Sequence, residues 1–218
     1  MYVKDQMVHK PYCIVKETTI SKALEVMASH HFHRLPVVDG NHRLIGLITE
    51  GMIADKTPGK ATSLSIYELN YLLSKTSVEE IMAKEVITIG PDALLEEAAV
   101  TMRAHDIGCL PVIDDEKYVV GIITQNDIFT AFIDMLGYQR EGARYVIRIK
   151  EDKPGILRDV AQCFSDLNIN ISNLAVDNNC RGIEVVVIAN GEGCEKAKDA
   201  LLSRGYDVVD VRKLENKK

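Results

Sequence analysis

Two short pairs of polar residues carry most of the chemistry that this sequence could perform. Thr124 and Asp127 stand three positions apart at the predicted start of a helix, and His33 and Arg34 are neighbours in the first half of the chain. A hydroxyl and backbone N–H groups at a helix N-terminus can hold a phosphate, which a cation can face from across a cleft. The Thr-x-x-Asp spacing is equally typical of a helix capping box, and a lone arginine is most often a solvated surface charge.

The sequence that must position these residues repeats itself. A set of residues recurs at one constant offset of 75 positions, from Pro36 to Pro111, so no residue was gained or lost between the copies. A gapless duplication means that one supersecondary unit is used twice, and we expect the two copies to pack face to face around a cleft. The recurring pairs are Met7 and Met82, Ile14 and Ile89, Ala23 and Ala98, Met27 and Met102, His30 and His105, Leu35 and Leu110, Pro36 and Pro111, Val37 and Val112, Asp39 and Asp114, Gly46 and Gly121, Ile48 and Ile123, Thr49 and Thr124, and Ile53 and Ile128.

Each copy is predicted to fold as strand, helix, strand, strand, helix. In both copies a short β-prone run precedes apolar residues at helical spacing, and two buried strands separated by a turn follow. Between the copies we expect a linker at 56–80, with a loop at 56–60 and a helix at 65–74. The expected strands span 12–15, 35–38 and 44–48 in the first copy and 86–89, 110–113 and 119–123 in the second.

The pattern changes after Gly142. Strand and helix signals alternate in the order βαββαβ, which is typical of a ferredoxin-like α+β domain. The expected strands span 144–149, 169–176, 183–189 and 206–211, and the expected helices span 156–167 and 195–204.

Composition and charge narrow the class of protein. The chain has 218 residues, 46% of them hydrophobic and 27% charged, as in ordinary globular proteins. A net charge of -6 argues against partners such as nucleic acid or anionic membranes. No apolar run is long enough to span a bilayer, and the N-terminus lacks the apolar core of a signal peptide. Five cysteines without a Cys-x-x-Cys pair indicate reduced thiols, so we expect a cytoplasmic protein.

Both copies carry a recognisable motif. The first reads His-Arg-Leu-Pro-Val-Val-Asp at 33–39 and Gly-Leu-Ile-Thr at 46–49, and the second reads Gly-Cys-Leu-Pro-Val-Ile-Asp at 108–114 and Gly-Ile-Ile-Thr-Gln-Asn-Asp at 121–127. Each resembles the CBS motif, and a pair of such motifs makes a Bateman module. The resemblance implies two β-α-β-β-α units, with motif 1 at 1–55 and motif 2 at 81–137. It also implies an adenosine ligand: AMP, ADP or ATP first, with S-adenosylmethionine, NAD or cyclic di-adenylate as further candidates.

The resemblance implies roles for particular residues at one half-site. Thr124 and Asp127 would hold the phosphate and the ribose hydroxyls, and His33 and Arg34 of the first copy would reach across to the same ligand. The base-lining residues that it implies are Thr88 and Ile89, with Pro36 nearby.

The mirror half-site lacks these groups. Met52 stands where the carboxylate belongs after Thr49, and Gly108 and Cys109 replace the His-Arg pair. We therefore expect one nucleotide site per chain.

Neither a metal site nor a catalytic set is expected. His30 and His31 are neighbours and cannot share one side of a helix, and no cysteine or carboxylate stands near them at a usual zinc spacing. The sequence contains no Gly-x-x-x-x-Gly-Lys-Ser/Thr, Gly-x-Ser-x-Gly or His-Glu-x-x-His motif.

The last third of the chain resembles the ACT domain over residues 144–213, through Lys150–Leu157 and Asn168–Ile171. ACT domains usually pair, and many bind an amino acid at the interface between two copies. The resemblance implies contacts from Asp152, Gly155, Ile156 and Asn170. Asp152 could instead only cap a helix, and the domain could serve for dimerisation alone.

The whole CBS-CBS-ACT layout resembles acetoin-utilization proteins of the AcuB type. That resemblance implies a cytoplasmic, non-enzymatic regulator connected with acetoin or acetate metabolism, acting as a homodimer on an unknown protein target. Two alternatives stay open: a structural scaffold whose clefts are empty, and a weak nucleotide hydrolase, which would need a metal and a base near the phosphates.

Overall fold

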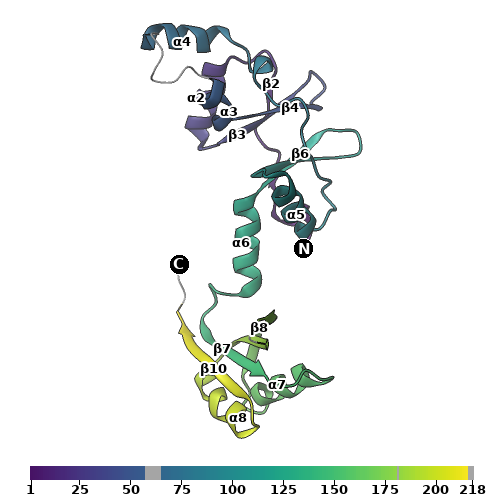
Figure 1. Cartoon of the computed structure of the whole chain (residues 1–218), viewed down its shortest axis with the longest axis vertical. Coiled ribbons are helices and arrows are strands. Elements are labelled where there is room, and N and C mark those ends of the chain that lie inside the picture. The colour runs from purple at the N-terminus through teal and green to yellow at the C-terminus, as the bar shows by residue number, and fades with distance from the viewer. Residues whose placement is uncertain (57–64, 181, 216–218) are drawn as a thin grey trace. The chain divides into compact units, whose positions relative to one another are not determined.

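The computed structural model describes residues 1–56, 65–180 and 182–215 (Figure 1). They form two compact units, Met1–Ile128 and Phe129–Lys218, with the division inside α6 (Gln125–Leu136). Most of the loop expected at 56–60 lies outside the described residues. Within the described ranges, no helix is long and apolar enough to cross a membrane.

The first copy forms a three-stranded sheet of order β2-β3-β4. β2 runs parallel to β3, and β3 and β4 are antiparallel, with Arg34 opposite Thr49. The copy therefore has the predicted strand-helix-strand-strand-helix order. Its elements are β2 (Ile14–Val15), α2 (Ile20–His30), β3 (Arg34–Val38), β4 (Leu44–Thr49) and α3 (Glu50–Lys56).

The second copy reproduces this register. β5 and β6 are antiparallel with Cys109 opposite Thr124, and the bulge after Val112 matches the bulge after Val37 in the first copy. The strand expected at 86–89 is reduced to a single parallel bridge between Ile89 and Val112. The elements are α5 (Leu95–His105), β5 (Cys109–Ile113), β6 (Val119–Thr124) and α6.

The segment in front of each copy packs on the other copy. β1 (Val8–His9), which follows α1 (Val3–Gln6), pairs with β6 of the second copy, where Val8 lies opposite Ile122. Ala83 pairs in the same way with Leu47 of the first copy, with N–H···O distances of 2.9 and 3.0 Å. This exchange ties the two copies into one body and lays residues 8–10 alongside β6, running from Ile122 back toward Val120.

Two close contacts make the exchange specific. A Cβ atom at Gly46 would lie 2.5 Å from Sδ of Met82, and a Cβ at Gly121 would overlap Sδ of Met7. Both methionines are buried, as expected for core residues. The recurrence of these glycines therefore reflects a packing requirement.

We expect Gly121→Ala to destabilise the first unit by about 1–3 kcal/mol, because the added methyl group overpacks the Met7 contact. Chemical denaturation of the purified chain measures the change. Gly40→Ala is the matched control, since a Cβ there meets no heavy atom within 4 Å. Equal stability of the two variants would contradict the proposed role of this contact.

The linker contains the expected helix, α4 (Ile66–Lys75), which contacts α2 (Figure 1). A capping box closes its N-terminus, with Ser65 accepting from the N–H of Glu68 and Glu68 accepting from that of Ser65. The chain then returns to the first copy, where the N–H of Val78, in η1 (Val78–Glu80), donates to the carbonyl of Thr18 at 2.8 Å.

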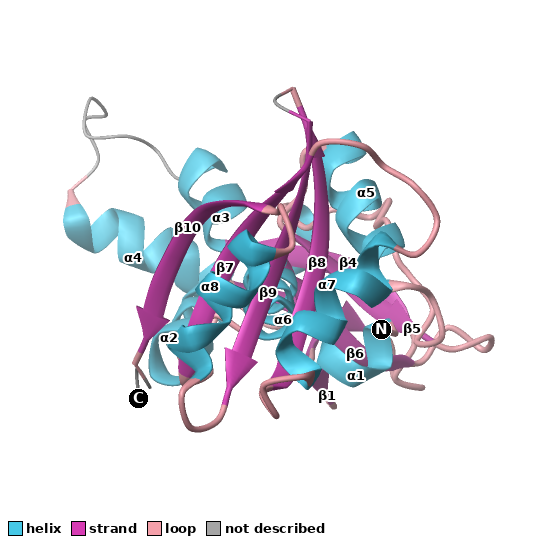
Figure 2. Cartoon of the chain, turned by 90° about the horizontal axis from the view of Figure 1, so that it is seen from below, coloured by secondary structure: helices cyan, strands magenta, loops and turns pink. Residues whose placement is uncertain are grey.

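The second unit has the predicted βαββαβ order. Its antiparallel sheet has the order β10-β7-β9-β8, and Figure 2 shows α7 and α8 against one face of these strands. Tyr145 and Phe164 are fully buried in the core between helices and sheet. The elements are β7 (Gly142–Ile149), α7 (Ile156–Ser165), β8 (Asn170–Asn179), β9 (Gly182–Asn190), η2 (Cys194–Lys196), α8 (Ala197–Ser203) and β10 (Asp207–Leu214).

Candidate functional site

A cavity of about 290 Å³ lies between the two copies in the first unit. Three segments supply its walls: residues 8–12, the end of α2 with the start of β3, and the junction of β6 with α6. Four of the predicted site residues, His33, Arg34, Pro36 and Thr124, line this one cavity. The complete lining is Val8, Lys10, Pro11, Tyr12, His31, Phe32, His33, Arg34, Pro36, Gly108, Ile122, Thr124, Gln125 and Asn126.

Asp127 lies beside the cavity and is held by Thr124. Its Oδ2 atom accepts hydrogen bonds from the backbone N–H and from Oγ1 of Thr124, each at 2.7 Å. The N–H of Asp127 donates in return to Thr124 Oγ1 at 3.3 Å. The capping-box arrangement is therefore present. It involves one carboxylate oxygen of Asp127, so it is compatible with a ligand contact at the other.

Arg34 crosses from the first copy to the second. Its Nη1 atom donates to the carbonyl oxygen of Gly108 at 2.5 Å. A Cβ at Gly108 would lie 3.1 Å from that nitrogen, so the missing side chain makes room for the guanidinium. The pKa of the Cys109 thiol is raised overall, because the effect of burial exceeds the opposing effect of the nearby Arg34. The thiol therefore adds no negative charge to the site. The guanidinium thus stands at the junction of the two half-sites.

His33 is exposed and pairs with Glu50 across 2.7 Å from its Nδ1 atom. This contact leaves Nε2 for another partner. In the mirror half, Thr49 caps α3 by accepting from the N–H of Met52 at 3.2 Å, and Met52 supplies no carboxylate.

Thr88 and Ile89 are placed differently from the expectation. Neither lines this cavity, and the backbone of Ile89 is hydrogen bonded to Pro111 and Ile113 at the edge of β5. The exchange of N-terminal segments explains the difference, because it brings residues 8–12 of the first copy to this position. The expected base lining was Thr88 and Ile89 with Pro36 nearby, and of these only Pro36 lines the cavity.

Lys10, Tyr12 and Phe32 were not predicted as site residues. An aromatic row flanks the cavity: the ring of Tyr12 lies 5.5 Å from that of His30, which stacks on Phe32 at 5.3 Å. A comparison of the two copies could have identified these three residues, because each differs in type from its counterpart. Lys10, Tyr12 and Phe32 correspond to Glu85, Ile87 and Ile107.

A second cavity of about 650 Å³ lies at the turn between β7 and α7 in the second unit. Asp152, Gly155 and Ile156 line it, as does Val176 of β8. Asn170 does not, because it stands six positions along β8 from Val176, a span of roughly 20 Å in an extended strand. Asp152 makes no capping bond to α7, whose N-cap is Gly155, so the alternative that Asp152 caps this helix is wrong.

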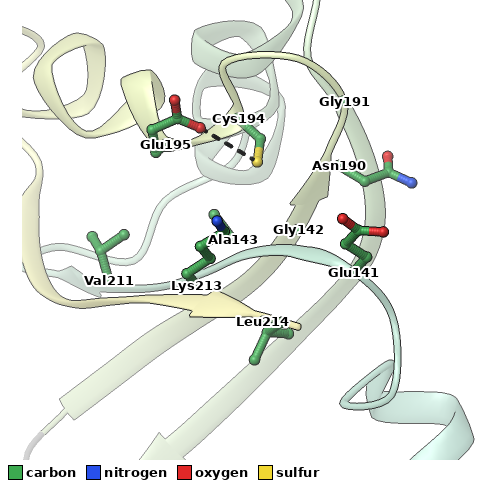
Figure 3. A pocket seen from close by; sticks show the side chains of 10 residues that line it. All are labelled: Glu141, Gly142, Ala143, Asn190, Gly191, Cys194, Glu195, Val211, Lys213 and Leu214. Atoms are coloured by element: carbon green, nitrogen blue, oxygen red, sulfur yellow. Dashed lines mark hydrogen bonds between the residues drawn. The ribbon is translucent and has the colours of Figure 1, made fainter. Parts of the chain in front are cut away.

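A third cavity, of about 730 Å³, lies at the opposite end of the same sheet (Figure 3). Glu141, Glu195 and Lys213 surround it, with Ala143 and Cys194 among its apolar lining. None of the predicted site residues lies here. Across the described ranges, no group of three His, Cys, Asp or Glu side chains is placed to hold a metal ion.

Comparisons with known proteins agree on the first unit. A family model described as the CBS domain matches residues 3–58 and 78–134. The uncharacterized protein MJ1225 of Methanocaldococcus jannaschii is 34% identical over 152 residues, which cover 66% of this chain and 54% of that protein. The chain thus spans about half the length of this curated relative, and it covers 23% of relatives named homoserine O-acetyltransferase.

Two solved structures are similar over the same region. The CBS domain pair of protein MJ0100, in complex with 5-methylthioadenosine and S-adenosyl-L-methionine, is 31% identical with a TM-score of 0.51, over 61% of this chain and 95% of the other. A putative acetoin utilization protein (AcuB) from Vibrio cholerae is 30% identical with a TM-score of 0.53, over 64% of this chain and 95% of the other.

Proposed function

Since this chain belongs to the CBS-domain family, we propose that it is a regulatory protein whose first unit binds one adenosine nucleotide per chain. The observation that carries the proposal is the cavity that gathers His33, Arg34, Pro36 and Thr124, with Asp127 beside it. AMP, ADP and ATP are the first candidates, and S-adenosylmethionine, NAD and cyclic di-adenylate the others. A solved relative that holds two adenosine compounds supports this class of ligand.

Each side chain has a role in this proposal. The carboxylate of Asp127 accepts ribose hydroxyls with the oxygen that Thr124 does not use, and the start of α6 receives phosphate through its backbone N–H groups. Arg34 and His33 face the phosphate, and Pro36 flanks the base. Tyr12 and Phe32 line the cavity, and Thr88 and Ile89 do not. A contact of Thr88 or Ile89 with the base therefore requires these residues to move toward the ligand.

The experiment that tests this proposal is calorimetry of the purified chain with adenosine ligands. We expect one ligand per chain and a loss of affinity of at least roughly tenfold in Asp127→Ala, because a charged hydrogen bond is lost. Met52→Ala, at the equivalent position of the mirror half, should bind as the unchanged protein does.

The alternative functions give different results in the same experiment. Equal losses in Asp127→Ala and Met52→Ala would contradict the one-site proposal. No binding of any nucleotide would favour the structural scaffold. Turnover of nucleotide by the purified chain, abolished in Asp127→Ala, would favour the hydrolase. We expect no turnover, because CBS pairs in general are regulatory modules.

For the second unit we propose a ferredoxin-like ACT domain that pairs with a second copy. Its element order and sheet order support this, and so does β8, a long edge strand that exposes Leu174 and Val176. The cavity at Asp152, Gly155 and Ile156 is the candidate amino-acid site. In that site Asn170 would come from the other copy, because within one chain it stands too far along β8.

We further propose that the nucleotide changes how the dimer engages a protein target, in acetoin or acetate metabolism. Similarity to the AcuB structure supports the pathway. A cytoplasmic location is proposed from the cysteines: Cys13, Cys109, Cys163, Cys180 and Cys194 are all free thiols.

A further inference from the structure

We infer that the cavity of the first unit selects its ligand by negative charge, and that Lys10 and His31 are specificity-determining residues that favour adenosine compounds with a phosphate chain over cationic ones such as S-adenosylmethionine. The inference rests on the proposed function, since it presumes that an adenosine ligand enters this cavity.

The lining of the cavity is basic although the chain is acidic. Lys10, His31, His33 and Arg34 face it, and no aspartate or glutamate is found among the described residues of its lining. Two acidic groups that contact lining residues are engaged, because Glu50 pairs with His33 and Asp127 accepts from Thr124. Even with histidine counted as neutral, as in the net charge of -6, the lining carries the positive charges of Lys10 and Arg34, which is a local reversal of sign. A cleft lined by one sign of charge concentrates ligands of the opposite sign.

The duplication supplies an internal comparison. The residue 75 positions after each basic lining residue is acidic or uncharged. Lys10 corresponds to Glu85 and His31 to Asp106, so two of the four positions change from basic to acidic. The other two, His33 and Arg34, correspond to Gly108 and Cys109. The two half-sites share one backbone fold, so the fold does not require basic residues at these positions. We therefore attribute the charge difference to ligand binding at the basic half-site.

Backbone geometry fixes both added basic residues before any ligand arrives. Lys10 directly follows β1, has a φ of 48°, and donates its N–H to the carbonyl of Val120 in β6 at 3.2 Å. His31 ends α2 with a φ of 56°, the left-handed conformation that Asp106 adopts with a φ of 52° at the end of α5. The position of Lys10 thus follows from the exchange of N-terminal segments. The backbone conformation of His31 also suits aspartate, because Asp106 adopts it at the equivalent position.

The physical consequence is an order of affinities. A phosphate chain gains an interaction with each basic group that it reaches, so affinity should rise from adenosine through AMP to ADP and ATP. S-adenosylmethionine offers only one carboxylate and has a net positive charge from its sulfonium and ammonium groups, so a basic lining disfavours it overall. Because the cavity is open to solvent, added salt should weaken ATP binding more than adenosine binding.

Calorimetry with adenosine, AMP, ATP and S-adenosylmethionine tests the inference on the full chain. We expect Lys10→Glu and His31→Asp, which install the residues of the mirror half, each to weaken ATP roughly tenfold. Adenosine affinity should stay within about twofold, because uncharged contacts are untouched, and S-adenosylmethionine should bind no worse than before. Lys84→Glu, an exposed charge reversal outside the cavity lining, is the control and should leave the ATP-to-adenosine ratio unchanged.

The outcomes separate this inference from the proposed function. S-adenosylmethionine binding as tightly as ATP, or an unchanged ATP-to-adenosine ratio in both Lys10→Glu and His31→Asp, would overturn charge selection while the adenosine site stands. Failure of all four ligands to bind the unchanged protein would overturn both proposals. Equal weakening of ATP and adenosine in these variants would also overturn charge selection, since the effect would then lie in the fold.

Discussion

Arg34→Ala is expected to weaken ATP binding about a hundredfold while the fold persists. The guanidinium stands at the junction of the half-sites, where Nη1 donates to the carbonyl oxygen of Gly108 at 2.5 Å. A hydrogen bond from a charged donor contributes about 1.5–3 kcal/mol, and a phosphate that loses a fork-shaped donor loses more than one such bond. Arg34 is only partly buried, so alanine leaves no large cavity. Titration with ATP measures the loss, and circular dichroism checks the fold.

Two further variants test whether ATP binding depends on the position of the Arg34 guanidinium or only on the number of positive charges. Gly108→Val should weaken ATP binding as well, because a side chain at this position takes the space of the guanidinium. Arg103→Ala, which removes an exposed arginine from α5, should have no effect. If Arg34→Ala bound ATP as tightly as the Arg103→Ala control, Arg34 would be a solvated surface charge.

Much of the fold could be predicted because the duplication constrains it. One pattern had to satisfy two copies, so the buried strands at β3, β4, β5 and β6 followed from alternating apolar runs and turns. The exchange of the segments before each copy could not be predicted. Local periodicity says nothing about which sheet β1 joins, and the choice is made by non-local contacts such as those of Met7 with Gly121.

The same limit applies to the site. His33, Arg34 and Thr124 were found because their types differ between the copies or match a motif, and the cavity brings them together. Lys10 and Tyr12 were missed because they reach the cavity only through the exchanged segment. Thr88 and Ile89 were expected there from the family resemblance alone, and the pairing of β1 with β6 places residues of the N-terminal segment in the cavity lining.

Phe164→Ala is expected to unfold the second unit without affecting nucleotide binding by the first. Phe164 is fully buried, and its ring meets that of Tyr145 edge to face with centroids 5.3 Å apart and an angle of 81°. Tyr145 in turn donates to the carbonyl of Cys194 at 2.6 Å, so the aromatic pair joins α7, β7 and η2. Removing a buried phenylalanine costs about 3–5 kcal/mol, a large part of the 5–15 kcal/mol that stabilises a typical domain.

Calorimetric scanning with and without ATP measures this effect. A domain of this size loses roughly 4–8 °C of Tm per kcal/mol, so the transition that ATP leaves unmoved should fall by about 15 °C or more. The transition that ATP raises should keep its Tm, since the site lies wholly within Met1–Ile128. Phe129→Ala, which removes an exposed phenylalanine, is the matched control. A single transition that falls as a whole in Phe164→Ala, with weaker ATP binding, would mean that the two units fold cooperatively. The second unit would then be energetically coupled to the nucleotide site.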